Sequence, residues 1–95
     1  MISGPDYAAF AECRGQLFTV AREQEMLAIE LTAVEALPAV PGRSQPFSLT
    51  FSGPLEPFMQ QMTYRLSHPH LGELSVFLVP VESKAGTTHY EAIFN

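Results

Sequence analysis

Three histidines and a glutamate are the residues whose types and spacing come closest to a metal-binding pattern. His68 and His70 are separated by Pro69, and His89 and Glu73 are the further candidate ligands. Two histidines at positions i and i+2 of a strand can share a zinc ion, and a third can complete an open catalytic site. One functional hypothesis is therefore a small-ligand or metal-dependent enzyme that uses these four side chains.

The proline between the two histidines favours a structural interpretation of the same residues. Pro69 fixes its own φ angle and predicts a turn, in which the side chains of His68 and His70 diverge. His68 would then form a hydrogen bond with the backbone of this turn. Short histidine spacings also have low specificity as metal signatures. We therefore predict no bound metal, no cofactor and no catalytic residue.

A lone cysteine and two tyrosines offer weaker chemical possibilities. Cys13 could pair with a histidine as a nucleophile and base, but it lies in a short predicted helix among Ala and Phe, and free cysteines are usually buried. Because it is the single cysteine, no intrachain disulfide and no Cys-based zinc site can form. Tyr64 and the pair Tyr90-Glu91 could line a small-ligand pocket, although aromatic residues at strand spacing more often belong to a core.

The acidic residues do not form a calcium site. Glu23, Glu25, Glu30 and Glu35 lie close together in the sequence, but the compact Asp/Asn/Gly run of a calcium loop is absent. We interpret these glutamates as solvated.

The charge composition argues against two classes of partner. The net charge is −5, and the five basic residues are scattered at Arg14, Arg22, Arg43, Arg65 and Lys84. A nucleic-acid surface needs clustered Lys and Arg, and an anionic lipid surface attracts the same kind of cluster. We therefore expect neither nucleic acid nor membrane as a partner. We also expect a cytoplasmic protein, because residues 1–6 lack the features of a signal peptide and no apolar run approaches about 20 residues.

The low charge content favours a protein partner. Charged residues make up 16% of the chain, against about 25% in typical soluble proteins. A small domain has much surface to cover, so some apolar surface is expected to contact another protein or a second copy of this chain. Polar uncharged residues such as Ser, Thr and Gln could cover part of it instead.

Period-two alternation of apolar residues dominates the second half of the chain and predicts antiparallel strands. The predicted strands of this half cover residues 47–51, 62–68, 72–82 and 87–95. Turns are predicted at residues 52–54, 68–72 and 83–86, a helical turn at 55–59, and the end of the fifth strand at Pro80.

The first half predicts one helix and two strands. Pro5 and Asp6 are typical of a helix start, so a helix is expected over residues 6–13, with Tyr7 and Phe10 closing one end of the sheet. Strands are expected at 16–20 and 26–37, the second with a bulge or strand end at 34–36. The competing interpretation of 26–37 is a helix, because Met, Leu, Ala and Glu are good helix formers. The proline-rich residues 38–46 predict a mobile loop.

These elements predict that residues 1–95 form a single mainly β domain, a small six-stranded antiparallel barrel or sandwich with one short N-terminal helix. The predicted core is Phe47, Leu49, Phe51, Tyr64, Leu66, Leu74, Val76, Leu78 and Phe94.

Five short motifs resemble a family of short bacterial β proteins of unknown function. The motifs are Phe10-x4-Gly15-x2-Phe18, Phe47-Ser48-Leu49-x-Phe51-x-Gly53-Pro54, Tyr64-x-Leu66-x-His68-Pro69-x-Leu71-Gly72, Phe77-Leu78-Val79-Pro80-Val81 and Tyr90-Glu91-Ala92-x-Phe94-Asn95. The resemblance covers nearly the whole chain and implies a small β domain with an accessory or assembly role beside phage-tail-collar-like or tail-fibre-like proteins. It transfers no active site.

The first hypothesis for function is thus a non-enzymatic binding or assembly module with a protein partner, or a homo-oligomer. The predicted last strand, residues 87–95, contains one ion, Glu91, and no proline. If it lies at a sheet edge, its unpaired backbone groups could pair with another chain. The alternative is that the barrel closes and the strand is paired on both sides, with the first and fifth strands.

Overall fold

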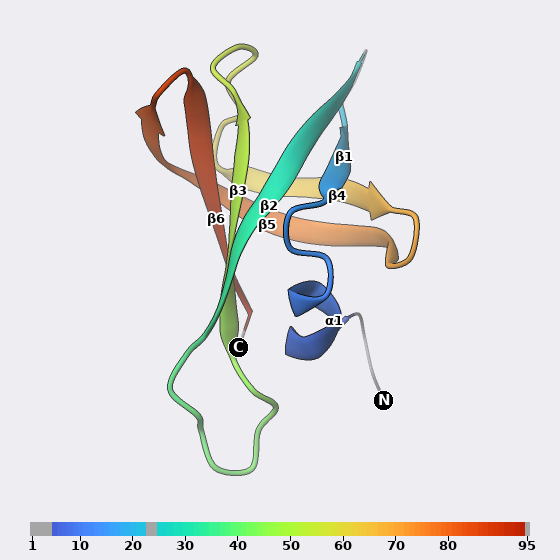
Figure 1. Ribbon diagram of the computed structural model, residues 1–95, viewed down its shortest axis with the longest axis vertical. Coiled ribbons are helices and arrows are strands. Elements are labelled where there is room, and N and C mark those ends of the chain that lie inside the picture. The colour runs from blue at the N-terminus through green and yellow to red at the C-terminus, as the bar shows by residue number, and fades with distance from the viewer. Residues whose placement is uncertain (1–4, 23–24, 95) are drawn as a thin grey trace.

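The computed structural model describes residues 5–22 and 25–94 and contains a closed barrel of six antiparallel strands with one short helix (Figure 1). The elements are α1 (Tyr7–Ala11), β1 (Leu17–Ala21), β2 (Met26–Ala36), β3 (Phe47–Pro54), β4 (Met62–His68), β5 (Gly72–Lys84) and β6 (Thr87–Phe94). The strand order is β1-β2-β3-β6-β5-β4, and β4 pairs back to β1. The mainly β prediction is confirmed, as a barrel. Glu23, predicted to be solvated, and Asn95, predicted in the last strand, lie outside the described residues.

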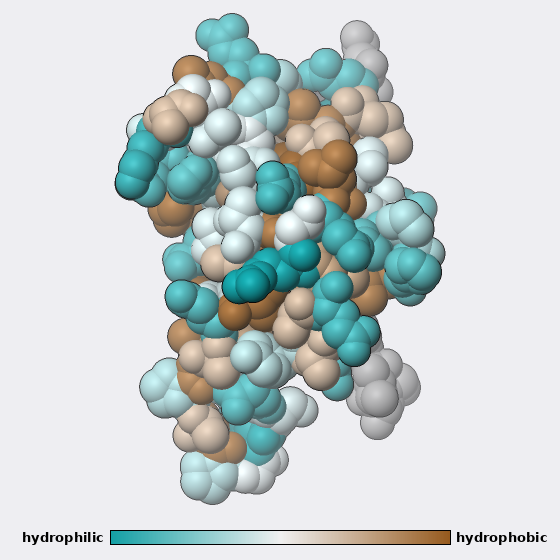
Figure 2. All heavy atoms as spheres, viewed as in Figure 1, coloured by the Kyte–Doolittle hydropathy of each residue, from teal (hydrophilic) through white to brown (hydrophobic). Residues whose placement is uncertain are grey.

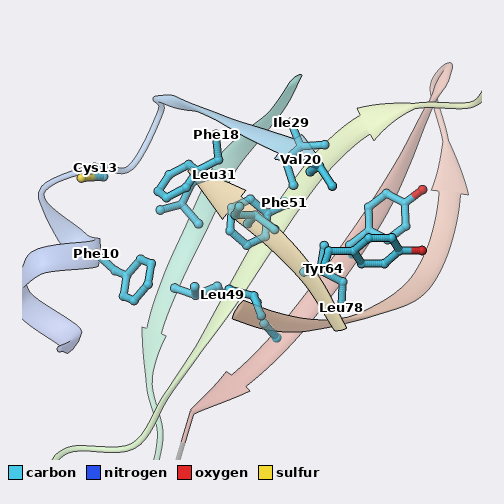
Figure 3. Close-up of a cluster of buried hydrophobic side chains, with 14 of the residues drawn as sticks. Phe10, Cys13, Phe18, Val20, Ile29, Leu31, Leu49, Phe51, Tyr64 and Leu78 are labelled. Carbon is cyan, nitrogen blue, oxygen red and sulfur yellow. The ribbon is translucent and has the colours of Figure 1, made fainter. Parts of the chain in front are cut away.

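The core fills the barrel with the inward-facing residues of all six strands (Figure 3). Most of the predicted core is buried, and Leu74 and Phe94 are partly buried against it. Strand alternation decided this outcome, because every second side chain of a barrel strand points inward. The core also contains residues that the prediction did not include: Phe18, Val20, Ile29, Leu31, Met59, Tyr90 and Ala92.

The helix closes one end of the barrel, as predicted. The Asp6 side chain caps α1 by accepting a hydrogen bond from the N–H of Ala9 at 3.0 Å. The ring of Phe10 is fully buried and packs against a group of aromatic rings at that end, namely Phe18, Phe47 and Phe94. Tyr7 also packs on Phe47.

The helix is shorter than the predicted range of 6–13. It ends at Ala11, and the chain then turns so that the N–H of Gly15 donates to the carbonyl of Leu31 at 2.7 Å. Gly15 has a φ angle of +86°, which suits glycine at such a turn. Cys13 lies in this turn and is buried, as the core interpretation predicted.

The prediction for residues 34–36 was a bulge or the strand end, and the strand end is confirmed, because β2 ends at Ala36. The bulge lies earlier: the register between β2 and β3 shifts between Leu31 and Ala33, and residues 34–36 remain paired with β3. Pro80 does not end β5, because it pairs with Tyr90 and the register shifts just after it, before Glu82. A bulge beside a proline allows the strand to continue without a donor at that position.

The predicted turn at residues 52–54 is part of β3 and pairs with β6. Gly53 is there because of close packing: a Cβ atom at this position would lie 2.9 Å from Cγ2 of Ile29. The predicted helical turn at residues 55–59 is also absent, and Met59 is buried in the core instead.

The last strand is paired on both sides over residues 87–91, so the prediction of a terminal strand at a sheet edge was wrong for this part of it. β6 pairs with β3 on one side and with β5 on the other. The alternative of barrel closure is correct, but the neighbours are β3 and β5, and β1 pairs with β2 and β4. Barrel closure satisfies the backbone donors and acceptors that an edge would leave open.

The β2–β3 connection extends beyond the helix end of the barrel, at the bottom of Figure 1. Its base is joined by a hydrogen bond from the N–H of Leu37 to the carbonyl of Pro46, and its tip is a turn in which the N–H of Arg43 donates to Val40. The Gln45 side chain adds a bond to the Leu37 carbonyl at 2.8 Å. The mobility expected for this loop stays a prediction. No helix in the described part of the chain is long and apolar enough to cross a membrane.

Candidate functional site

His68 is a structural residue at the end of β4. Its side chain is 5% exposed and packs on the ring of Phe18, with 4.6 Å between ring centroids. Its Nδ1 accepts hydrogen bonds from the backbone N–H groups of His70 and Leu71, at 3.1 and 3.4 Å. The interpretation that His68 bonds the backbone of the turn is therefore confirmed.

The second ring nitrogen of His68 is also engaged. Nε2 lies 2.7 Å from Oε1 of Gln16. Because Nδ1 accepts, we assign the proton of the neutral ring to Nε2, which then donates to Gln16. Burial lowers the pKa of His68, and the neighbouring His70 lowers it further. Both nitrogens have protein partners, so this ring has no free lone pair for a metal.

The four candidate metal ligands do not form a metal site, although the rings of His68 and His70 are neighbours, with 5.9 Å between their centroids. His68 points into the barrel, whereas His89 lies on the outer side of β6 with its Nδ1 3.6 Å from Oε2 of Glu82. Glu73 is exposed, and its Oε1 lies 3.9 Å from Nη1 of Arg65. Within residues 5–22 and 25–94, no three His, Cys, Asp or Glu side chains gather closely enough to hold a metal.

Cys13 is poorly suited to act as a nucleophile. Burial raises the pKa of its thiol, and the charge of Glu12 raises it further. A thiol rather than a thiolate is therefore the resting form, and the thiol is a weak nucleophile.

An open groove that the sequence did not predict as a whole lies at the other end of the barrel from α1. It has a volume of about 790 Å³, within the range of small-ligand sites. It lies between the β1–β2 turn, the start of β4 and the connection formed by residues 55–61. The lining residues are Ala21, Arg22, Glu25, Phe58, Gln60, Met62, Thr63, Tyr64 and Arg65.

Apolar side chains are left exposed in this groove. Phe58 and Met62 are each 50% exposed. Met62 begins β4 on the same side as buried Tyr64, so it stands at the mouth of the barrel where the core gives way to solvent. Figure 2 shows apolar residues in the upper part of one face, where β1 and β2 meet in Figure 1, within a more polar surface.

Two tyrosine hydroxyls hold the groove in shape. Tyr64 donates from its hydroxyl to the carbonyl of Gln60 at 2.7 Å. The hydroxyl of Tyr90 accepts from the buried N–H of Met59 at 3.0 Å, which ties the connection to β6. The connection is therefore anchored to the barrel at Met59 and Gln60, the two residues that follow Phe58.

The charges of the groove are two arginines and one glutamate. Arg65 lies beside the end of β1, because Arg65 of β4 pairs with Ala21 of β1. The N–H of Arg22 donates to the carbonyl of Glu25 at 3.0 Å, which joins the end of β1 to the residue before β2. Burial raises the pKa of Tyr64, and the charge of Arg22 opposes this rise. The guanidinium of Arg22 thus acts electrostatically on the groove's phenol.

Part of the groove could have been found in the sequence. Tyr64 was a candidate for a ligand pocket and lines the groove, and Tyr90 supports it from below. Glu91, the third member of that suggestion, does not line it. The meeting of Arg22 with Arg65 depends on the β1–β4 pairing that closes the barrel, and no local pattern signals that pairing.

The chain matches the family described as "Domain of unknown function (DUF6916)" over residues 5–94. It belongs to this family, as the resemblance to a family of unknown function predicted. No curated protein and no solved structure matches the chain.

Proposed function

We propose that this member of the DUF6916 family is a non-enzymatic binding module that takes up a segment of a partner protein in the groove at the mouth of its barrel. The observation that carries the proposal is the half exposure of Phe58 and Met62 beside Arg22 and Arg65. Exposed apolar side chains with a few polar groups around them are typical of interaction sites. The dispersal of His68, His89 and Glu73 over both sides of the barrel wall gives the enzyme hypothesis no comparable support.

The wider role we propose is accessory to a larger, phage-tail-like protein in bacteria. It rests on what the resemblance of the five sequence motifs implies. We propose a cytoplasmic setting, in keeping with a single, buried and unpaired cysteine.

Peptide display on the purified protein tests this function. Random peptides of about ten residues would be selected on immobilised folded protein and counter-selected on urea-unfolded protein. We expect enriched peptides that bind with one-to-one stoichiometry and micromolar affinity. Repeated selections without enrichment, or enriched peptides that prefer the unfolded chain, would contradict the proposal.

A second copy of the chain is the other candidate partner, and the outer wall of the barrel is the surface that favours it. Phe77 on β5 and Ile93 on β6 are about half exposed, and each lies two residues along its strand from the Val79–Glu91 pair. Because β6 is paired on both sides over residues 87–91, we expect such a dimer to form by contact between the outer surfaces of two barrels. Light scattering at micromolar concentration tests it: a dimer that Ile93→Lys converts to monomer supports self-association, and a monomeric wild type rules it out.

A further inference from the structure

We infer that the groove recognises a carboxylate next to a bulky apolar side chain, so that the partner segment carries Asp or Glu beside a residue such as Leu or Phe. This inference rests on the proposed binding function and adds the chemistry of the bound segment. Three observations support it. One arginine has a hydrogen-bond donor without an acceptor, and a second arginine has only a weak ion pair. The groove also has a net positive charge, whereas the whole chain has a net negative charge.

Arg22 supplies the first observation. Its Nη1 is buried and has no hydrogen-bond partner among residues 5–22 and 25–94. A guanidinium is always charged, and a buried donor without an acceptor is costly. A carboxylate oxygen in the groove would satisfy this donor once the guanidinium turns from its buried position towards the groove, and the planar fork of an arginine matches a carboxylate with two parallel hydrogen bonds.

Arg65 supplies the second observation. Its ion pair with Glu73 is 3.9 Å long, and both side chains are largely exposed. Exposed pairs of this kind contribute little free energy, so exchanging Glu73 for a ligand carboxylate costs little. Arg65 lines the same groove as Arg22, and one anion at the mouth can attract both.

The third observation is the charge of the groove relative to the whole chain. The chain carries ten acidic and five basic residues, for a net charge of −5. The groove holds two of those five basic residues and one acidic residue, Glu25. An acidic segment is repelled by the protein as a whole and attracted at this mouth, which gives the site its selectivity.

The apolar part of the ligand follows from Phe58 and Met62. Both side chains are half exposed in the groove, and burying them under an apolar residue of the segment is favourable. A methionine also adapts its shape to different apolar partners. The arginines and this apolar pair together specify an acidic residue with an apolar neighbour.

Two peptides that differ in one charge test the inference. The probes are acetyl-Gly-Leu-Glu-Phe-Gly-amide and the same peptide with Gln in place of Glu, titrated into labelled protein and followed by amide chemical shifts. We expect the Glu peptide to bind about tenfold more tightly, as for a charge-assisted hydrogen bond. Its shifts should centre on the groove residues, and its affinity should fall as salt rises.

Arginine variants show which side chain causes the preference for the Glu peptide. Arg22→Gln should remove the preference for the Glu peptide, and Arg65→Gln should reduce it. Arg14→Gln is the matched control, because Arg14 follows α1 at the other end of the barrel, and it should change nothing. The amide spectrum of each variant reports whether it is folded.

The outcomes separate the inference from the proposed function. Equal binding of the two peptides, unaffected by Arg22→Gln, would overturn the carboxylate preference and leave the binding module intact. Binding of neither peptide would also overturn the inference, and the display selection described above would then decide the proposed function by itself.

Discussion

At the residue scale, His68 illustrates how a candidate ligand becomes part of the fold. A histidine beside a Pro-His dipeptide suggests metal chemistry, but here the ring closes the β4–β5 turn and reaches Gln16 in the segment before β1. The turn could be predicted from Pro69. The bond to Gln16 could not, because it joins residues that only the β1–β4 pairing brings together.

His68 should make the stability of the protein depend on pH. Its pKa in the folded protein is lowered below the ordinary value of 6.5, so the unfolded chain takes up a proton first as the pH falls. Stability from this group is therefore complete above about pH 6.5 and is lost as the pH drops from there towards the lowered folded pKa. Urea unfolding at pH 7.5 and at pH 5 measures the loss.

The variant His68→Gln should lower stability at both values of pH and should show a smaller difference between them. His89→Gln is the control, because His89 lies on the outer side of the barrel beside Glu82. An undiminished pH difference in His68→Gln would show that other groups cause it.

Gly53 offers a second test at this scale. A Cβ atom there would press on Ile29, which is fully buried and cannot move freely. Gly53→Ala should therefore lower the free energy of unfolding by about 1–3 kcal/mol. Ser52→Ala, one residue earlier and facing the other side of β3, should change it by less than about 0.5 kcal/mol. Similar effects for the two variants in urea unfolding would count against the close packing at Gly53.

At the scale of elements, strand alternation predicted most of the fold and chain closure decided the rest. The bounds of β4 follow directly from its alternating residues. The turn at residues 85–86 follows from the small residues at these positions. The bulge after Leu31 and the continuation of β5 through Pro80 depend on how neighbouring strands fit together in a barrel. The groove depends on the connection at residues 55–61, which has no regular structure to predict.

The hydroxyl of Tyr90 should hold that connection in place. Tyr90→Phe removes the acceptor of the buried Met59 N–H, so we expect a loss of about 1–3 kcal/mol in the free energy of unfolding. The amide of Met59 should also exchange faster with deuterium. Tyr7→Phe, a partly exposed tyrosine on α1, is the matched control. Slow exchange at Met59 in Tyr90→Phe would mean that the connection does not depend on this bond.

At the scale of the whole molecule, one continuous core supports all six strands, and the two ends of the barrel differ. Aromatic rings and α1 close one end, and the other end opens into the groove. Because the barrel is closed and β6 is paired on both sides over residues 87–91, we expect the proposed partner to bind side chains rather than to extend the sheet. The sequence suggested that assembly occurs by strand pairing. We propose instead that a partner binds in the groove or on the outer surface of the barrel.

The core should respond strongly to truncation. Phe51 and Leu78 are fully buried, and changing either to Ala should cost about 2–5 kcal/mol. Leu17→Ala on the outer wall is the control and should have a small effect, because that side chain is largely exposed. Thermal unfolding followed by far-ultraviolet circular dichroism measures this, and the native spectrum should be that of a β protein. A helical spectrum, or equal effects for all three variants, would contradict the barrel.

The most direct test of the central claim compares two phenylalanines of equal exposure. Phe58 lies in the groove and Phe77 on the outer wall, and each is 50% exposed. Calorimetric titration of a display-selected peptide into Phe58→Ser and Phe77→Ser separates the two surfaces. The groove account predicts at least about tenfold weaker binding for Phe58→Ser, as for loss of a central interface residue, and less than about twofold change for Phe77→Ser. Weaker binding to Phe77→Ser with unchanged binding to Phe58→Ser would contradict it.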